Sequence, residues 1–421
     1  MPPEFASRKR QAFFAALCLV LAAGIFLRLP ASLFDKGGAL HALSILHPNP
    51  AFTGIGFDEG LYRDYVDNLT RVGLTNYSDI VDHYIEVQKT LPGSILPPMR
   101  FLYIFFGYLW HQLFGTEALA ALHNVASFFG ILNLLLATAF AWRMKGRAAA
   151  LGVGALIAFA PTQIHMSQHA LVDGFFTFWA LLSLWLFWEN LKAPRDWRWL
   201  VPYTLALALM VTTKENAAFV YIALLVLVVA NRWLRWGTIT RELLACTLIG
   251  PLLGFVILVF LAGGLETLRT SYQLSISKNF TLPYAIMTGD GPWHRYLIDL
   301  LLVSPLVLLL ALAAVVRLDL QKKPELFMAV FIAASYLVMC NLKYGMNLRY
   351  ANMWDMPLRV LAFSALGGLT FSLGRYRTAA LIGAIALICA MELRQYLILF
   401  VQFPLYELVP QGLLRALHIL K

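Results

Sequence analysis

The stretch "SRKRQAFFAALCLVLAAGIFLRLP", residues 7–30, decides the class of fold. A group of basic residues precedes an apolar run at 12–29 that is long enough to cross a bilayer. The run ends at Arg28, Leu29 and Pro30 and has no small-residue cleavage site after it. We therefore expect an uncleaved first membrane helix rather than a removable signal peptide.

The rest of the chain repeats this apolar pattern. Hydrophobic residues make up 60% of the 421 residues and charged residues 13%, about half the charged share of a soluble domain. Since backbone groups in lipid must be hydrogen-bonded within the segment, the runs are expected to be helices. The runs lie near 12–29, 98–115, 118–142, 147–162, 171–191, 199–212, 216–231, 243–265, 296–316, 325–341, 350–373 and 377–401.

The distribution of basic residues predicts the topology. Basic clusters mark cytoplasmic loops, and six of them can share one side only if one of the twelve runs does not cross. The exception is "PPMRFLYIFFGYLWHQLFG", 97–115, because it begins with a proline pair and contains Arg100 and His111. We expect eleven spans, with the N-terminus inside and the C-terminus outside. The six clusters are Arg8-Lys9-Arg10, Arg143-Lys145-Arg147, Lys192-Arg195-Arg198, Arg232-Arg235-Arg241, Arg317-Lys322-Lys323 and Arg375-Arg377.

This topology gives an all-α polytopic membrane protein with one transmembrane domain, 1–401, and a short tail, 402–421. The net charge of +10 lies in short clusters between apolar runs, and no basic patch with interleaved aromatic residues suggests nucleic acid as a partner. The predicted outer face carries most of the polar residues that could take part in a reaction. Its segments are a large first loop at 31–117, the stretches 163–173 and 212–216, a second large loop at 266–295, and 341–350.

The first outer loop contains "GIGFDEGLYRDY", residues 54–65, with Asp58 and Glu59 side by side. One interpretation is structural: Asp58 stands where a helix N-cap belongs, and Glu59 is placed to pair with Arg63 one turn later. Gly54 and Gly56 would permit a close approach of the backbone. The other interpretation is that a carboxylate here acts as a general base.

Further ionisable residues occur near the outer ends of the predicted spans. Asp173 begins one span, and Lys214 and Glu215 interrupt an apolar stretch from 199 to 231. Structural roles are available for each: an N-cap for Asp173, a plain turn for "TTKEN", and snorkelling basic residues for "NLKYGMNLRY", 341–350. Charges near membrane depth are costly, however, and point to a functional site.

Several stretches resemble the GT-C glycosyltransferases, in the branch of protein O-mannosyltransferases and lipid A aminoarabinose transferases (glycosyltransferase family 39). The resemblance covers roughly 10–375, and its motifs occur in the family's order. They are "FDEGLYRDYVDNL", with the Asp-Glu motif of the first outer loop, "LPPMRFLYIFFGYLWHQLFG", "FAPTQIHMSQHALVDGFFTFWALLSLWLF", "TTKENAAFVYIALL" and "LRYANMWDMPLRVLA". The sequence departs from its relatives at Leu96, often His or Lys, and at His123, where a basic Arg is common.

The resemblance implies transfer of a sugar from a polyprenyl-phosphate donor to an acceptor hydroxyl at the extracytoplasmic face, with inversion. Asp58 would be the general base, and Glu59 would orient it or bind the acceptor. Cations would stabilise the leaving phosphate, and a divalent metal could share this role, although no clear ligand motif is visible. The expected phosphate-binding residues are Lys214, Arg349, His294 and Arg295, and the expected substrate-binding residues are Asp173, Tyr62 and Tyr350.

The alternative function is a transporter or a flippase for lipid-linked sugars. Transporters place ionisable residues at mid-depth in broken helices, whereas here they crowd the outer ends of spans. The sequence does not name the sugar, and the acceptor could be a protein, a lipid or a glycan. We expect a multi-pass protein of a bacterial inner membrane.

Overall fold

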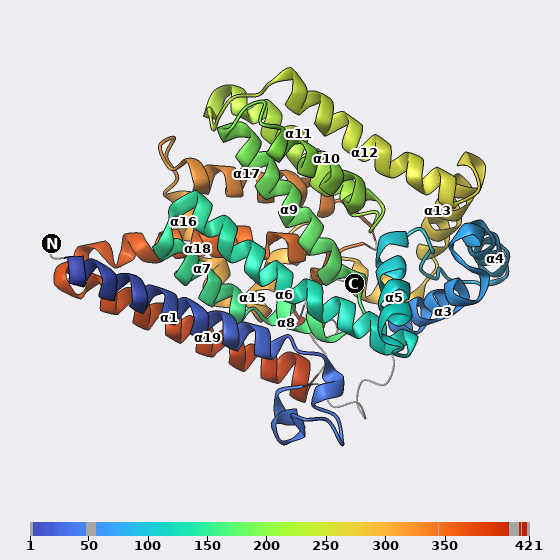
Figure 1. The fold of residues 1–421 in the computed structure, drawn as a ribbon, viewed down its shortest axis with the longest axis horizontal. Helices are drawn as coiled ribbons and strands as arrows, with labels where there is room; N and C mark the ends of the chain where they lie inside the picture. Colours follow the sequence, from blue (N-terminus) through green and yellow to red (C-terminus); the bar gives the residue numbers. More distant parts are fainter. Residues whose placement is uncertain (1–2, 48–55, 344, 404–411, 414, 419–421) are drawn as a thin grey trace.

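A computed structural model describes residues 3–47, 56–343, 345–403, 412–413 and 415–418. The regular structure of this part of the chain is helical, without strands (Figure 1), which confirms the all-helical class. The α-helices are α1 (Pro3–Leu27), α3 (Phe57–Val72), α4 (Tyr77–Thr90), α5 (Phe101–Phe114), α6 (Ala118–Lys145), α7 (Arg147–Ala158), α8 (Pro161–Gln168), α9 (Val172–Lys192), α10 (Trp197–Val211), α11 (Ala217–Leu234), α12 (Arg241–Leu261), α13 (Leu265–Asn279), α14 (Pro283–Gly289), α15 (Arg295–Val303), α16 (Pro305–Val316), α17 (Lys323–Met339), α18 (Asp355–Leu369) and α19 (Arg377–Tyr396).

Six short helical turns complete these described elements. Five of them are 3-10 turns and the last is a π-helical turn that extends α19. They are η1 (Ala31–Leu33), η2 (His41–Leu46), η3 (Leu74–Asn76), η4 (Leu348–Trp354), η5 (Phe371–Tyr376) and η6 (Leu397–Gln402).

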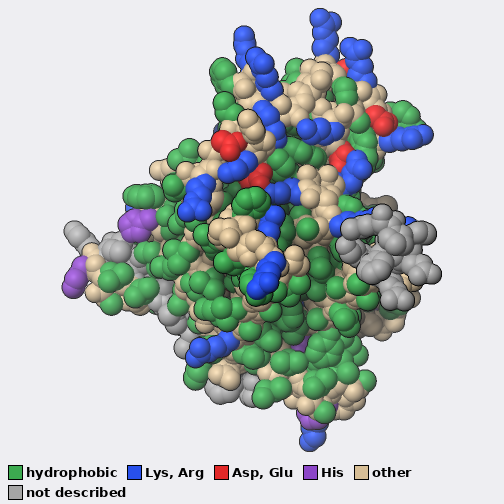
Figure 2. Space-filling view, turned by 90° about the vertical axis from the view of Figure 1, so that its left-hand side faces the viewer, with side chains coloured by type: hydrophobic (Ala, Val, Ile, Leu, Met, Phe, Trp, Pro, Cys, Tyr) green, Lys and Arg blue, Asp and Glu red, His purple; other side chains and the backbone are tan. Residues whose placement is uncertain are grey.

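Basic residues gather at one end of the helix bundle, drawn on the left of Figure 1 and facing the viewer in Figure 2. Lys145 at the end of α6 pairs with Glu325 at the start of α17. Lys192 at the end of α9 donates to the carbonyl of Trp236, just beyond α11. We call this end, formed by the last turns of α6, α9 and α11 and the first turn of α17, the basic face. Its composition agrees with the side that the sequence predicts to be cytoplasmic.

Among the residues that the structure describes, five helices are long and apolar enough to cross a membrane, and the pair α7 and α8, bent by 58° at its break, raises the number to six. Two further apolar helices, α10 and α16, are shorter. These helices support an integral membrane protein, while the count of eleven spans stays a prediction. The five segments are Arg10–Leu27, Ala118–Lys145, Ala217–Leu234, Arg241–Leu261 and Phe371–Gln402.

The end of the bundle away from the basic face is covered by α3, α4, α5 and α13 (right of Figure 1). These helices come from the two large loops predicted at 31–117 and 266–295. Tyr65 and Tyr77 donate hydrogen bonds of 2.6 Å each to the carbonyls of Leu96 and Pro98, and so fasten the segment before α5 to α3 and α4. Lys278 of α13 donates to carbonyl groups at the end of α4, among them that of Lys89 at 3.0 Å. The predicted loops therefore form a packed helical cover.

The helix α5 has 14 residues, which gives a length of about 21 Å at 1.5 Å per residue. The hydrocarbon core of a bilayer is about 30 Å thick. The helix α5 is shorter than this thickness, and that the segment 98–115 does not cross the membrane stays a prediction.

We predict that the two ends of the segment from α5 to α6 lie on opposite sides of the membrane, because α6 is the only crossing expected between them. Single cysteines would replace Leu113, which is 67% exposed, and Arg147, in a chain whose four native cysteines are substituted. A membrane-impermeant thiol reagent added outside should label position 113 and leave position 147 unlabelled. Labelling of both positions from the same side would show that the topology is wrong.

Candidate functional site

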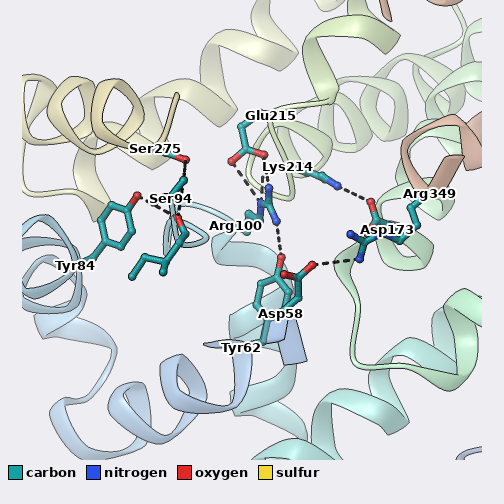
Figure 3. A network of polar contacts seen from close by, with 11 residues as sticks. Asp58, Tyr62, Tyr84, Ser94, Arg100, Asp173, Lys214, Glu215, Ser275 and Arg349 are labelled. Atoms are coloured by element: carbon teal, nitrogen blue, oxygen red, sulfur yellow. Dashed lines mark hydrogen bonds and ion pairs between the residues drawn. The ribbon is translucent and has the colours of Figure 1, made fainter. Parts of the chain in front are cut away.

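Four segments that are far apart in the sequence bring their charged residues together between the bundle and its helical cover. They are the first turn of α3, the first turn of α9, the turn between α10 and α11, and η4 (Figure 3). Arg349 Nη1 lies 3.2 Å from Asp58 Oδ2. The backbone at Arg349 is fixed because its N–H donates to Asn347 Oδ1 at 2.9 Å. The two residues that the sequence predicts as base and phosphate ligand thus form an ion pair.

A second ion pair lies beside the first. Lys214 donates to Asp173 Oδ1, and both side chains are buried. The ammonium also stands 4.0 Å from the centre of the Tyr350 ring, an arrangement that favours a cation. Burial lowers the pKa of Lys214 to about 8, although the neighbouring Asp173 carboxylate raises it. Figure 3 draws Arg349 near both Asp58 and Asp173, so Lys214 and Arg349 lie beside the same group of carboxylates.

A third pair was not predicted. Arg100, which precedes α5, binds Glu215 with its Nε and Nη2 atoms at 3.2 and 3.1 Å from Oε2. Its Nη1 donates to the hydroxyl of Tyr62 at 2.9 Å. The neighbours Lys214 and Glu215 therefore reach opposite partners, one on α9 and the other before α5. The signal in the sequence was an arginine within an apolar segment. The sequence does not show which residue pairs with this arginine.

The structure corrects the expectation that Asp58 is an N-cap. Helix α3 begins at Phe57, with Gly56 as its N-cap, so Asp58 is already within the first turn. Glu59 closes the helix start instead, because its Oε2 accepts a 2.9 Å hydrogen bond from the N–H of Gly56. Asp58 is therefore available for other contacts, and the predicted neighbour Gly54 lies outside the described residues.

Glu59 does not pair with Arg63 as expected. Arg63 binds Asp64 at 2.9 Å on the exposed side of α3, while Glu59 points inwards and is 5% exposed. Glu59 is held by groups from α6 and from the segment before α9. Its Oε1 accepts a 2.7 Å hydrogen bond from the N–H of Ala170 and lies 3.0 Å from His123 Nε2 and 3.5 Å from His169 Nδ1.

These contacts decide the ionisation of Glu59. Burial would raise its pKa, but the hydrogen bonds from His123 and His169 outweigh burial and hold the pKa of the carboxyl well below its usual range. These contacts favour the ionised carboxylate of Glu59, which joins α3 to the bundle. His123, which stands where relatives often have Arg, is one of its partners.

Three further residues were predicted for the site or for a helix cap: Asp173, His294 and Arg295. Asp173 is in the first turn of α9 with Leu171 as the N-cap, so the N-cap expectation for Asp173 is wrong. Arg295 is buried against Asp299, with Nε 3.6 Å from Oδ2, and His294 precedes α15 with its ring beside Trp293. Among the described residues, no hydrogen bond or ion pair joins His294 or Arg295 to the ion pairs around Asp58.

The expectation about a divalent metal stays untested. Within the part of the chain that the structure describes, no group of three or more His, Cys, Asp or Glu side chains is arranged to hold a metal ion.

Comparisons with known proteins agree with this architecture. The family model for dolichyl-phosphate-mannose-protein mannosyltransferases matches residues 108–268. ArnT from Cupriavidus metallidurans in the apo state aligns with a TM-score of 0.52 at 16% identity, covering 96% of this chain and 76% of that one. The chain has a GT-C fold. The resemblance stated from the sequence motifs is thereby confirmed.

A second solved structure widens the comparison. The oligosaccharyltransferase of Archaeoglobus fulgidus in the apo form aligns with a TM-score of 0.62 at 12% identity, covering 95% of this chain and 56% of that chain. This chain thus spans little more than half of that GT-C protein. No curated protein matches the sequence.

We predict that Glu59→Gln destabilises the protein more than Asp58→Asn. The partners of Glu59 include two backbone N–H groups on its two oxygens, so an amide NH₂ would face a donor, and a buried group left unsatisfied costs about 1–3 kcal/mol. Asp58 has a side chain that is 27% exposed, and loss of its ion pair should cost about 0–1 kcal/mol. Thermal unfolding of the purified variants measures the difference. Equal midpoints would contradict the structural role of Glu59.

Proposed function

We propose that the protein is a membrane glycosyltransferase that moves a sugar from a polyprenyl-phosphate donor to an acceptor hydroxyl. The observation that carries the proposal is the pair of neighbouring contacts Asp58–Arg349 and Asp173–Lys214. Together they provide a carboxylate suited to general-base catalysis and two cations suited to a phosphate. Asp58 is half-buried rather than fully buried, so an incoming hydroxyl can approach its carboxylate.

The position of the site favours a lipid-linked substrate. Helix α9 carries Asp173 in its first turn and Lys192 as its last residue, so about 28 Å of helix separates the site from the basic face. This distance is close to the thickness of the bilayer core. If the basic face is cytoplasmic, as its charge favours, the site lies at the extracytoplasmic interface, where the phosphate of a membrane-anchored donor would be found.

The solved relatives support the donor class. ArnT has been crystallised with undecaprenyl phosphate, and the archaeal oligosaccharyltransferase has been solved with an inhibitory peptide and a dolichol-phosphate. We propose a polyprenyl-phosphate sugar as the donor for this chain. A protein, a lipid or a glycan hydroxyl would be the acceptor, and the peptide in the archaeal structure favours a protein.

In the proposed reaction the acceptor oxygen attacks the anomeric carbon of the sugar as the bond from that carbon to the phosphate oxygen breaks. The acceptor proton passes to Asp58, and the electron pair of the broken bond leaves with the polyprenyl phosphate. Arg349 and Lys214 stabilise the negative charge that grows on this phosphate. A single displacement of this kind inverts the configuration at the anomeric carbon.

The Asp58–Arg349 ion pair links donor binding to activation of the base. While Arg349 binds Asp58, the guanidinium occupies the carboxylate oxygen Oδ2 that an acceptor hydroxyl would need. A donor phosphate that draws Arg349 towards itself would release Asp58 for the acceptor hydroxyl. Glu59 would position α3, and Arg100 would position Tyr62 and the turn that carries Lys214, through Glu215.

The arrangement disfavours the transporter alternative. The ion pairs lie where helices begin and where loops meet, at Asp58, Asp173 and Lys214, rather than halfway along a helix. A transporter would place such groups near the bilayer midplane.

We predict that Asp58→Asn lowers the rate of sugar transfer by about 10²–10⁴-fold, while donor binding is kept, since the amide cannot take a proton. Asp64→Asn is the matched control, because Asp64 lies on the same helix but is exposed. Its side chain pairs with Arg63 and lies away from the candidate site. The measurement is turnover by purified protein alongside binding of undecaprenyl phosphate. A stable Asp58→Asn protein with nearly full activity would exclude Asp58 as the base and leave Asp173 as the next acid to test.

We also predict that the binding of undecaprenyl phosphate weakens as the pH rises through about 8. Below this pH Lys214 is protonated and attracts the phosphate, and above it the ammonium loses its proton. The Lys214→Arg variant keeps its charge at all these pH values, so its affinity should stay level between about pH 7.5 and 9.5. If wild type and variant show the same pH profile, Lys214 does not bind the phosphate.

A further inference from the structure

A cavity of about 330 Å³ lies at the basic face, between the last turns of α6 and α9 and the first turn of α17. Arg143, Glu189, Lys192 and Lys323 provide its charged lining. It is separated from the candidate active site by the length of α9, so the proposed reaction does not use it.

The charges around the cavity do not balance. Arg143 and Glu189 neutralise each other through two hydrogen bonds, Nε to Oε1 at 2.9 Å and Nη2 to Oε2 at 2.7 Å. Glu189 also accepts a 2.9 Å hydrogen bond from Trp185 Nε1, which fixes it further. Three cations and one carboxylate leave a net charge of +2 on the lining, and this excess belongs to the two lysines.

The two lysines are held in place by the end of α11. Lys192 donates to the carbonyl of Trp236 at 2.7 Å, and Lys323 donates to the carbonyl of Leu234. Trp236 is itself buried and donates from Nε1 to the carbonyl of Lys323 at 2.9 Å. An ammonium has three N–H donors, so each lysine keeps two donors beyond its bond to the helix end. The cavity therefore presents fixed donors and positive charge to an anion.

The other wall of the cavity is apolar. Lys192 stands 4.7 Å from the centre of the Trp188 ring, and Met144 and Pro324 complete the lining. A tryptophan beside lysines at the end of apolar helices is typical of the headgroup level of a membrane. A free phosphate ion would gain nothing from this apolar wall, whereas a lipid would place its glycerol and upper acyl chain against it.

We propose that this cavity binds the phosphodiester headgroup of an anionic glycerophospholipid from the leaflet at the basic face. Basic pockets between transmembrane helices bind such headgroups. The bound phosphate would accept hydrogen bonds from Lys192 and Lys323, and would tie together α9, α11 and α17. The cavity would hold the headgroup and the glycerol end of the lipid, while the rest of the acyl chains would remain in the bilayer.

The test measures lipid binding to the full-length protein in detergent by native mass spectrometry, with phosphatidylglycerol and phosphatidylcholine offered in turn. Wild type should retain phosphatidylglycerol in preference. The variant Lys192→Gln/Lys323→Gln should lose that preference by about tenfold or more, because each lysine near the surface contributes to attraction of an anionic lipid. The variant Lys192→Arg/Lys323→Arg keeps both charges and should keep the preference.

A matched control removes two charges from the same face without touching the cavity. Arg317 and Lys322 are exposed, and the variant Arg317→Gln/Lys322→Gln should bind phosphatidylglycerol as wild type does. An equal loss in this control would overturn the proposal in favour of diffuse surface attraction. Displacement of the lipid by millimolar inorganic phosphate would overturn it in favour of a free-phosphate site. If the glutamine variant unfolds, the arginine variant decides the matter, since loss of preference there also contradicts the proposal.

Discussion

Burying an ionised side chain without a partner costs several kcal/mol. This cost governs the end of the bundle that carries the candidate site. Two ion pairs there join different segments: Lys214 with Asp173, and Arg100 with Glu215. The pairs therefore act as cross-links among α5, α9 and the turn between α10 and α11. The arrangement of the helices and the arrangement of the site have the same physical origin.

In the proposed function, the same constraint would let the site respond to a substrate. An arginine that is already bound to a carboxylate can exchange it for a phosphate without passing through an unpaired state. Arg349 is placed for this exchange, since it contacts Asp58 and lies next to Asp173. Glu59 is different, because its partners include backbone N–H groups that a phosphate cannot draw away. The two adjacent acids therefore differ: Glu59 is fixed by backbone groups, whereas Asp58 contacts a cation that our proposal assigns to the phosphate.

The sequence predicted the helical class because it depends on local features. The same holds for the residues of the two neighbouring ion pairs, which are Asp58, Arg349, Asp173 and Lys214. Apolar length predicts helices, and a charge in an apolar run indicates a paired or functional group. The turn at Lys214 between α10 and α11 is found where two charges interrupt the run. The partners could not be predicted in the same way. Arg100 and Glu215 are 115 residues apart, and they meet because the start of α5 lies against the turn between α10 and α11, where the N–H of Leu102 donates to the carbonyl of Thr212.

The capping error at Asp58 shows where local reasoning ends. Asp is a favourable N-cap residue, but the helix begins two residues earlier than an N-cap at Asp58 would give, because Glu59 can satisfy the N–H of Gly56 from the third position. That choice turns Glu59 towards His123 and directs Asp58, about 100° away around the helix, towards Arg349. A shift of two residues in the start of α3 therefore decides which carboxylate is buried and fixed, and which one faces the cations that we assign to the phosphate.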